Sequence, residues 1–250
     1  MVAVKRDAGM EIIPAIDLRE GRVVRLRQGD FERESTFGGD PVAVARQWAE
    51  QGARRLHLVD LDGARAGHPV QASLVERIIS SVSIPCQVGG GIRTSDDARR
   101  MQALGADRVI LGTALLRDRR LGPDLVKDHG AERIVAAIDV RGGMAVGSAW
   151  AAGAAGEDYR PAVERLCEAG LRWFAVTSVE RDGMLTGPDL ATLIALRDAF
   201  PKARLIASGG IATVADLRVL AGAGMAAAIL GRSLYEGRID LTEALAATSS

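Results

Sequence analysis

The amino-acid sequence predicts an α/β fold, namely a (β/α)8 TIM barrel built from two duplicated (β/α)4 halves. First, the segment Gly90–Thr94 (GGIRT) returns 119 positions later as Gly209–Thr213 (GGIAT). Second, eight short apolar segments alternate with helical patterns, as parallel strands joined by helices do. Third, the length of 250 residues suits one such barrel.

The repeat reaches into both halves of the chain. Gly112 and Gly231 keep the separation of 119, and Ala15–Arg19 returns as Ala137–Arg141 122 positions later. Solenoid repeats have periods of roughly 20–50 residues, whereas this period is about half of the chain. Two copies of such a unit indicate a duplicated half-domain, because the two halves can close on each other.

The first half contains four predicted strands, each a short run of β-branched and aliphatic residues. These strands are Glu11–Leu18, Arg55–Leu61, Ile84–Val88 and Arg108–Leu111. Val23–Leu26 is expected to continue the first strand after Gly21. Apolar residues at helical spacing predict helices at Pro41–Gln51, Val70–Ser81 and Asp96–Leu104.

The second half repeats this order of elements. Its predicted strands are Ile134–Ile138, Trp173–Thr177, Arg204–Ala207 and Ala227–Leu230. Its predicted helices are Pro161–Glu168, Pro188–Phe200, Val214–Ala221 and a segment near the C-terminus. A doubly wound sheet is the alternative, but a duplication into four plus four units favours closure. We therefore expect one barrel domain over residues 10–250 and a disordered N-terminal extension at residues 1–9.

Composition and charge exclude several classes of protein. Lys plus Arg equals Asp plus Glu at 32 each, so no excess charge favours nucleic acid or an anionic membrane. No apolar run approaches the ~20 residues of a membrane helix, and the N-terminus lacks the apolar core of a signal peptide. Cys86 and Cys167 are too few for a disulfide framework, so we expect buried free thiols. We expect a cytoplasmic monomer without nucleic-acid or membrane partners.

Glycines and small polar residues follow the third, fourth, seventh and eighth predicted strands. Glycine lets backbone N–H groups approach a phosphate closely, and a helix that begins there adds the positive end of its dipole. In a barrel these strand ends all line one mouth, which is the catalytic face. Two such pairs of loops predict a small-molecule ligand with two phosphates. The residues concerned are Gly90, Gly91, Gly112, Thr113, Ser208, Gly209, Gly210, Gly231 and Arg232.

Asp17 and Asp139 stand at equivalent places on the first and fifth predicted strands. These strands lie opposite each other in an eight-stranded barrel, so the two carboxyls should face each other across its centre. Such a pair can serve as acid and base when burial raises one pKa and hydrogen bonds keep the other group ionised. Aspartates that merely cap loops are the alternative. No metal is expected, because His57, His68 and His129 are scattered, and we expect these histidines to be packed or solvated.

Several motifs together resemble the ProFAR isomerase family of histidine biosynthesis, the phosphoribosylformimino-5-aminoimidazole carboxamide ribotide isomerases. The motifs are Pro14–Leu18, Gly21–Leu26, His57–Gly63, Gly89–Arg93, Arg181–Gly183 and Ser208–Ile211. The resemblance runs from about Met10 to the C-terminus and implies a barrel enzyme. It implies an Amadori rearrangement, from aminoaldose to aminoketose, of a substrate with a phosphate at each end. No cofactor is implied, because a Schiff base within the substrate serves as the electron sink.

The resemblance also implies roles for single residues. Asp139 would be the general acid that helps to open the ribose ring, and Asp17 would remove the proton from C2. Thr177 would orient the substrate or Asp139, and Asp182 would contact the substrate. Further expected substrate contacts are Arg25, Arg93 and Trp150.

Related activities are alternatives to this assignment. The cyclase subunit of imidazole glycerol phosphate synthase shares the duplicated barrel, but it opens with Cys-Leu-Asp where this chain has Ala15-Ile16-Asp17. Some relatives also isomerise phosphoribosylanthranilate, and Arg25, Arg93 and Trp150 are compatible with that second substrate. A phosphoribosyl-binding regulator without catalysis would have lost one of the aspartates. We expect mobile loops at Glu32–Gly39 and Ala151–Glu157 to close over the substrate.

Overall fold

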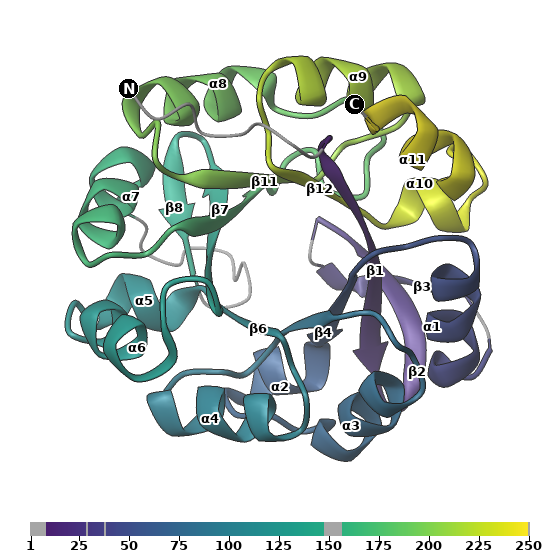
Figure 1. Ribbon diagram of the computed structural model, residues 1–250, viewed down its shortest axis with the longest axis horizontal. Coiled ribbons are helices and arrows are strands. Elements are labelled where there is room, and N and C mark those ends of the chain that lie inside the picture. Colours follow the sequence, from purple (N-terminus) through teal and green to yellow (C-terminus); the bar gives the residue numbers. More distant parts are fainter. Residues whose placement is uncertain (1–8, 29, 38, 148–156, 250) are drawn as a thin grey trace.

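Eight parallel strands form a closed barrel in the computed structural model, which describes residues 9–249 except 29, 38 and 148–156 (Figure 1). In order around the barrel these strands are β1 (Glu11–Arg19), β4 (Leu56–Asp60), β5 (Cys86–Gly89), β6 (Arg108–Leu111), β7 (Ile134–Arg141), β10 (Trp173–Ser178), β11 (Arg204–Ser208) and β12 (Ala227–Leu230). Closure comes from the parallel pairing of β12 with β1, in which Glu11 faces Ala227. The predicted barrel is therefore confirmed.

Helices form a ring around the barrel (Figure 1). The described helices are α1 (Pro41–Glu50), α2 (Leu61–Ala66), α3 (Ala72–Ser80), α4 (Ser95–Ala103), α5 (Thr113–Arg117), α6 (Leu121–His129), α7 (Tyr159–Glu168), α8 (Leu190–Ala199), α9 (Val214–Gly222), α10 (Arg232–Tyr235) and α11 (Leu241–Thr248). No bounds were predicted for the helical segment after the fourth strand, where α5 and α6 lie. Gly122 and Pro123 obscure the pattern of α6, but proline is tolerated in the first turn of a helix.

Two antiparallel ribbons follow the first and fifth barrel strands in the chain and pair with them. One consists of β2 (Arg22–Arg27) and β3 (Asp30–Thr36), and the other of β8 (Met144–Val146) and β9 (Glu157–Asp158). Asp17 faces Val24 in the first ribbon, and Asp139 faces Val146 in the second. Val24 and Val146 are 122 positions apart, as Asp17 and Asp139 are, so the two ribbons pair in the same register.

The ribbon at β2 and β3 corrects two expectations. Val23–Leu26 does not continue β1 but runs back along it, because Glu20 and Gly21 adopt positive φ angles of 49° and 75° and reverse the chain. Part of the expected loop at Glu32–Gly39 belongs to β3, which pairs with β2. Polar residues concealed this strand, since a ribbon with solvent on its faces needs no apolar alternation.

Two layers of apolar residues hold the barrel. The larger layer lies between strands and helices, and a smaller cluster fills the barrel interior, with Ile13, Val135, Trp173 and Ile206 among its members. Trp173 begins β10, and its Nε1 donates to Glu132 Oε2 at 2.8 Å. The interior is therefore packed at the end of the barrel where the strands start.

The repeated segments begin two equivalent helices. The hydroxyl of Thr94 accepts from the backbone N–H of Asp97, and the Asp97 carboxylate accepts from the backbone N–H of Thr94. Thr213 and Asp216 form the same reciprocal cap on α9. A shared capping function therefore explains why threonine and aspartate recur at a separation of 119 positions.

None of the described helices is long and apolar enough to cross a membrane. Cys86 and Cys167 are both free thiols, as expected. Burial raises the pKa of Cys86 to about 12 and that of Cys167 to about 11. Cys86 is fully buried, whereas Cys167 on α7 is partly buried and packs against the core.

Candidate active site

A cavity of about 290 Å³ opens at the carboxyl ends of the barrel strands. It is lined by every predicted site residue that the structure describes. These residues are Asp17, Arg25, Gly90, Gly91, Arg93, Gly112, Thr113, Asp139, Thr177, Asp182, Ser208, Gly209, Gly210, Gly231 and Arg232. Trp150 lies outside the described residues. Residues from all eight barrel strands or their following loops thus converge on one space.

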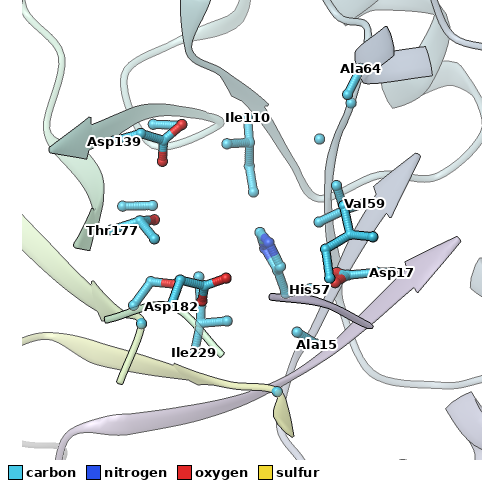
Figure 2. Close-up of a pocket in the computed structure, with 18 of the residues that line it drawn as sticks. Ala15, Asp17, His57, Val59, Ala64, Ile110, Asp139, Thr177, Asp182 and Ile229 are labelled. Carbon is cyan, nitrogen blue, oxygen red and sulfur yellow. The ribbon is translucent and has the colours of Figure 1, made fainter. Parts of the chain in front are cut away.

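Asp17 and Asp139 lie on opposite sides of this mouth (Figure 2). Asp17 stands on β1, and Asp139 stands on β7, where Thr177 of the neighbouring strand β10 is its register partner. Thr177 is 9% exposed and points into the same mouth (Figure 2). The arrangement therefore allows Thr177 to orient a group held by Asp139.

Arg25 forms an ion pair with Asp17, with 2.5 Å between Nη1 and Oδ2. Both side chains are only 13% exposed. The guanidinium occupies the space beside Gly231, where a Cβ would collide with it. Gly231 is consequently required for the position of Arg25, in addition to any contact with a ligand.

Tyr235 supports Arg25 from the other side, and sequence reasoning did not identify it. Its ring centroid lies 5.6 Å from the Arg25 guanidinium carbon, and its hydroxyl donates to the Ala15 carbonyl at 3.1 Å. Burial raises the pKa of Tyr235 to about 12, so the phenol stays neutral. A helix after the last strand thus buttresses a ribbon that follows the first strand.

Asp182 brings a third carboxyl to the cavity. It belongs to the turn after β10 and lies across the mouth from Asp17 (Figure 2). Burial, reinforced by the negative charges of Asp17 and Asp139, raises the pKa of Asp182 to about 7. Asp182 is therefore suited to carry a proton near neutral pH, a property that its place in the sequence did not indicate.

The glycine-rich loops have left-handed backbone at the positions that the repeat equates. Gly90 and Gly91 have φ angles of 100° and 77°, and Gly209 and Gly210 have 86° and 80°. A Cβ on Gly90 would collide with the Asp60 carbonyl, and one on Gly210 with the Gly187 carbonyl. Glycine is therefore needed for the packing of these loops as well as for close approach of a ligand.

The loops after β6 and β12 leave helix N-termini open toward the cavity. Gly112 precedes α5 and Gly231 precedes α10, and neither cap makes a side-chain hydrogen bond in the described part of the chain. Arg232 lines the cavity while it donates to Glu236 and to the Gly183 carbonyl. Each side of the mouth therefore offers backbone N–H groups, and one side also offers a fixed guanidinium.

His57 is a cavity residue that the sequence analysis assigned to packing or solvent. It stands on β4 with its ring in the middle of the mouth (Figure 2). Its Nδ1 lies 3.0 Å from the side-chain nitrogen of Gln87 on β5. Burial and the charge of Arg25 lower the pKa of His57 to about 3, so the ring is neutral. Alternation along β4 could have indicated this, since Leu56 and Leu58 pack outward and are fully buried.

Asp60 follows β4 but organises a loop instead of lining the cavity. Its carboxylate accepts from the backbone N–H groups of Gly63, Val70 and Gln71 at 2.7–2.8 Å. It is 2% exposed and is absent from the residues that line the cavity. Among the described residues no cluster of three His, Cys, Asp or Glu side chains could hold a metal ion.

Comparison with known proteins agrees with this geometry. Residues 11–240 match the family described as "Histidine biosynthesis protein". A protein of Roseiflexus sp. (strain RS-1) is 49% identical over 239 residues, which cover 95% of this chain and 99% of that protein. Relatives from Chloroflexus aurantiacus and Synechococcus sp. (strain CC9311) are 46% and 44% identical, cover 95% of this chain, and are covered over 97% and 93% of their own lengths. All three are named 1-(5-phosphoribosyl)-5-((5-phosphoribosylamino)methylideneamino)imidazole-4-carboxamide isomerase.

Proposed function

The chain belongs to the histidine biosynthesis protein family, and on this basis we propose that it is the isomerase that converts ProFAR to its aminoketose, PRFAR. The observation that carries the proposal is the convergence of two opposed aspartates and two pairs of glycine-rich loops on one cavity. An isomerase of this kind acts on a small molecule with a phosphate at each end. The relatives' names give no support to the cyclase or to a second activity on phosphoribosylanthranilate.

The two phosphates would bind on opposite sides of the mouth. One would lie against the loops at Gly90–Arg93 and Gly112–Thr113, and the other against Ser208–Gly210 and Gly231–Arg232. Backbone N–H groups at left-handed glycines and at uncapped helix starts hold phosphate oxygens well. Binding at both ends would place the ribose that reacts between Asp17 and Asp139.

The reaction needs one acid and one base at this place. The acid protonates the ring oxygen of the ribose as the C1–O bond breaks, and the exocyclic nitrogen forms a C1=N Schiff base. Asp17 then removes the proton from C2, and the electron pair of that bond forms the enolamine. Tautomerisation of the enolamine gives the C2 ketone, so the electrons balance without an external oxidant. A cofactor is not needed, which stays a prediction together with the cytoplasmic monomer.

Asp139 and Asp182 are both candidates for the acid. Asp139 is the acid that the family resemblance implies, and Thr177 beside it would orient it. Asp182 is the carboxyl whose raised pKa, about 7, favours a bound proton. We therefore propose that Asp182 shares or supplies the proton that opens the ring, while Asp139 positions the ribose or completes the transfer.

The test is turnover by the purified chain on ProFAR and, in parallel, on phosphoribosylanthranilate. We expect activity on ProFAR and a loss of several orders of magnitude in Asp17→Asn and Asp139→Asn, each of which keeps the shape of the side chain. Near-normal turnover in either variant would contradict the proposed roles. An inactive wild-type chain would contradict the isomerase assignment itself.

A further inference from the structure

His57, which is partly exposed to the cavity, and Gln87, which is fully buried, form a hydrogen-bonded pair. They are register partners on the neighbouring strands β4 and β5, so their side chains point to the same side of the sheet. Gln87 is 0% exposed and does not line the cavity, whereas His57 does. A ligand in the cavity can therefore contact His57 but not Gln87.

The contact between them fixes the tautomer of the histidine. The side-chain nitrogen of Gln87 lies 3.0 Å from His57 Nδ1. An amide nitrogen can only donate, so Nδ1 must accept and cannot carry a proton. Since burial and Arg25 keep the ring neutral, its single proton is on Nε2. In the described part of the chain Nε2 has no protein partner, and the ring stands in the mouth (Figure 2).

Stability alone does not explain an amide at position 87. Gln87 Oε1 is buried and has no hydrogen-bond partner among the described residues. Burying a polar group without a partner is unfavourable, and an apolar side chain of the same size would avoid that cost. Within the described residues, the amide makes one hydrogen bond, which goes to His57. The polar group at this position is consequently best explained by its effect on the imidazole.

We propose that Gln87 is a positioning residue that holds His57 with its proton on Nε2, so that this N–H donates a hydrogen bond to the oxygen on C2 of the substrate. The proposal rests on the isomerase function proposed above. When Asp17 removes the C2 proton, the electron pair of the C2–H bond moves toward the Schiff-base nitrogen, and the C2 oxygen stays a hydroxyl. A neutral N–H in the centre of the mouth holds that oxygen by a lone pair and so keeps the C2–H bond directed toward Asp17.

The tautomer can be measured on the ligand-free protein, independently of activity. The chain has three histidines, so the ¹⁵N and ¹H signals of each ring can be assigned by single His→Gln variants. We expect His57 to carry its proton on Nε2. His129 is the internal control, because its Nδ1 lies 2.9 Å from the oxygen of Gln102 and must therefore carry a proton. A His57 ring with its proton on Nδ1 would overturn the inference.

Kinetics of Gln87→Glu test the consequence for catalysis. A carboxylate at position 87 accepts from Nδ1–H, so at high pH His57 loses the proton on Nε2. We expect the turnover number to fall about 100-fold at pH 9 and to recover toward pH 6, where a second proton returns to Nε2. The matched control is Gln102→Glu, which changes the other glutamine–histidine pair on helices outside the cavity. A pH profile of Gln87→Glu that parallels wild type and Gln102→Glu would overturn the inference.

Gln87→Met separates positioning from folding. Methionine fills the same space without fixing the tautomer, so we expect about a 3- to 10-fold lower turnover number, an unchanged KM and a melting temperature equal to or above that of wild type. In a His57→Leu background the same substitution should change turnover less than about twofold, because Gln87 acts through His57. An undiminished effect in that background would overturn the inference. Inactive wild-type protein would defeat the proposed function as well, whereas active wild type with the other tautomer would defeat this inference alone.

Discussion

Asp17 is a catalytic candidate whose charge the protein also needs for its own structure. Its carboxylate is the ion-pair partner of Arg25, and both groups are mostly buried. Removing one partner of such a pair leaves the other charge buried and uncompensated, which costs more than the pair contributes. Effects on activity and on stability must therefore be separated at this residue.

We expect Asp17→Asn to lower turnover by orders of magnitude and to destabilise the fold by about 3 kcal/mol, because Arg25 loses its counter-charge. The double variant Asp17→Asn with Arg25→Met should regain most of that stability and stay inactive. Urea unfolding and ProFAR turnover measure the two effects. Equal stability of the single and double variants would show that the buried arginine does not cause the loss.

Asp182 should make both stability and activity depend on pH. Its pKa is raised from 3.8 to about 7, so the folded state binds the proton more tightly than the unfolded state. The stability that this proton provides is full below about pH 4 and is lost as pH rises through 7. We expect Asp182→Asn, which is never charged, to gain melting temperature relative to wild type between pH 4 and pH 8. A constant difference across this range would contradict the raised pKa.

Some residues of the site could be predicted from the sequence, and others could not. The aspartates and glycines could be predicted because they follow strands and recur in the repeat. Trp150 lies outside the described residues and stays a prediction. His57 and Tyr235 were missed because neither has a counterpart in a short motif of the repeat. The place of His57 in the site depends on which face of β4 points inward. The place of Tyr235 depends on packing between α10 and β2.

At the scale of elements, the glycine loops combine a special backbone with close packing. Gly210 has a φ of 80°, and a Cβ there would collide with the Gly187 carbonyl. Gly143 has a φ of 78° in the turn before β8, but a Cβ there would meet nothing within 4 Å. Both glycines thus have left-handed backbone, but only a Cβ at position 210 would collide with a neighbouring atom.

We expect Gly143→Ala to cost about 1 kcal/mol of stability, which is the cost of left-handed backbone alone. Gly210→Ala should cost several times more and raise the KM for ProFAR, since the loop must shift away from Gly187. Chemical denaturation and steady-state kinetics measure both. Equal losses in the two variants would mean that the collision with Gly187 is relieved at no cost.

The strands that the sequence did not predict are polar or very short: β3 is mostly polar, β8 has three residues and β9 has two. The barrel strands were predicted because they are buried on both faces and read as apolar runs. β2 and β8 run back along the barrel strands β1 and β7, and their register comes from the turns at Glu20–Gly21 and Gly142–Gly143. Turn geometry of this kind is decided by a few φ angles, which composition does not reveal.

Across the whole molecule, stability and chemistry lie at opposite ends of the barrel. The Trp173 ring at the start of β10 is covered by Arg108, whose guanidinium carbon is 3.7 Å from the ring centroid, and by Arg204 at 5.1 Å. Thr177 follows four residues later, about 13 Å along the strand. The two ends are therefore separated by packed side chains.

We expect Trp173→Ala to destabilise the protein by about 3–5 kcal/mol, because it opens a cavity among buried residues and removes two cation–π contacts. Turnover on ProFAR below the new melting temperature should stay within about twofold of wild type. Trp173→Phe, which keeps most of the ring, is the milder control. A large loss of turnover in folded Trp173→Ala would show that the two ends are coupled.

The barrel as a whole was predictable because alternation, repeat and length all indicated the same closed arrangement. The closing contact itself could not be read from a local pattern, since it joins Glu11–Pro14 to Ala227–Leu230. The contact follows only from the number of strands, because eight parallel strands in one sheet leave no unpaired edge strand when the first pairs with the last.

The pairing of β1 with β12 has a consequence for the nascent chain. During synthesis on a ribosome, β1 is made first, and its partner β12 is made last, 216 residues later by the pairing of Glu11 with Ala227. Until then the nascent sheet has a free edge that can pair with other chains. Slow synthesis of the segment between β1 and β12 would therefore prolong the time during which this edge can pair with other chains.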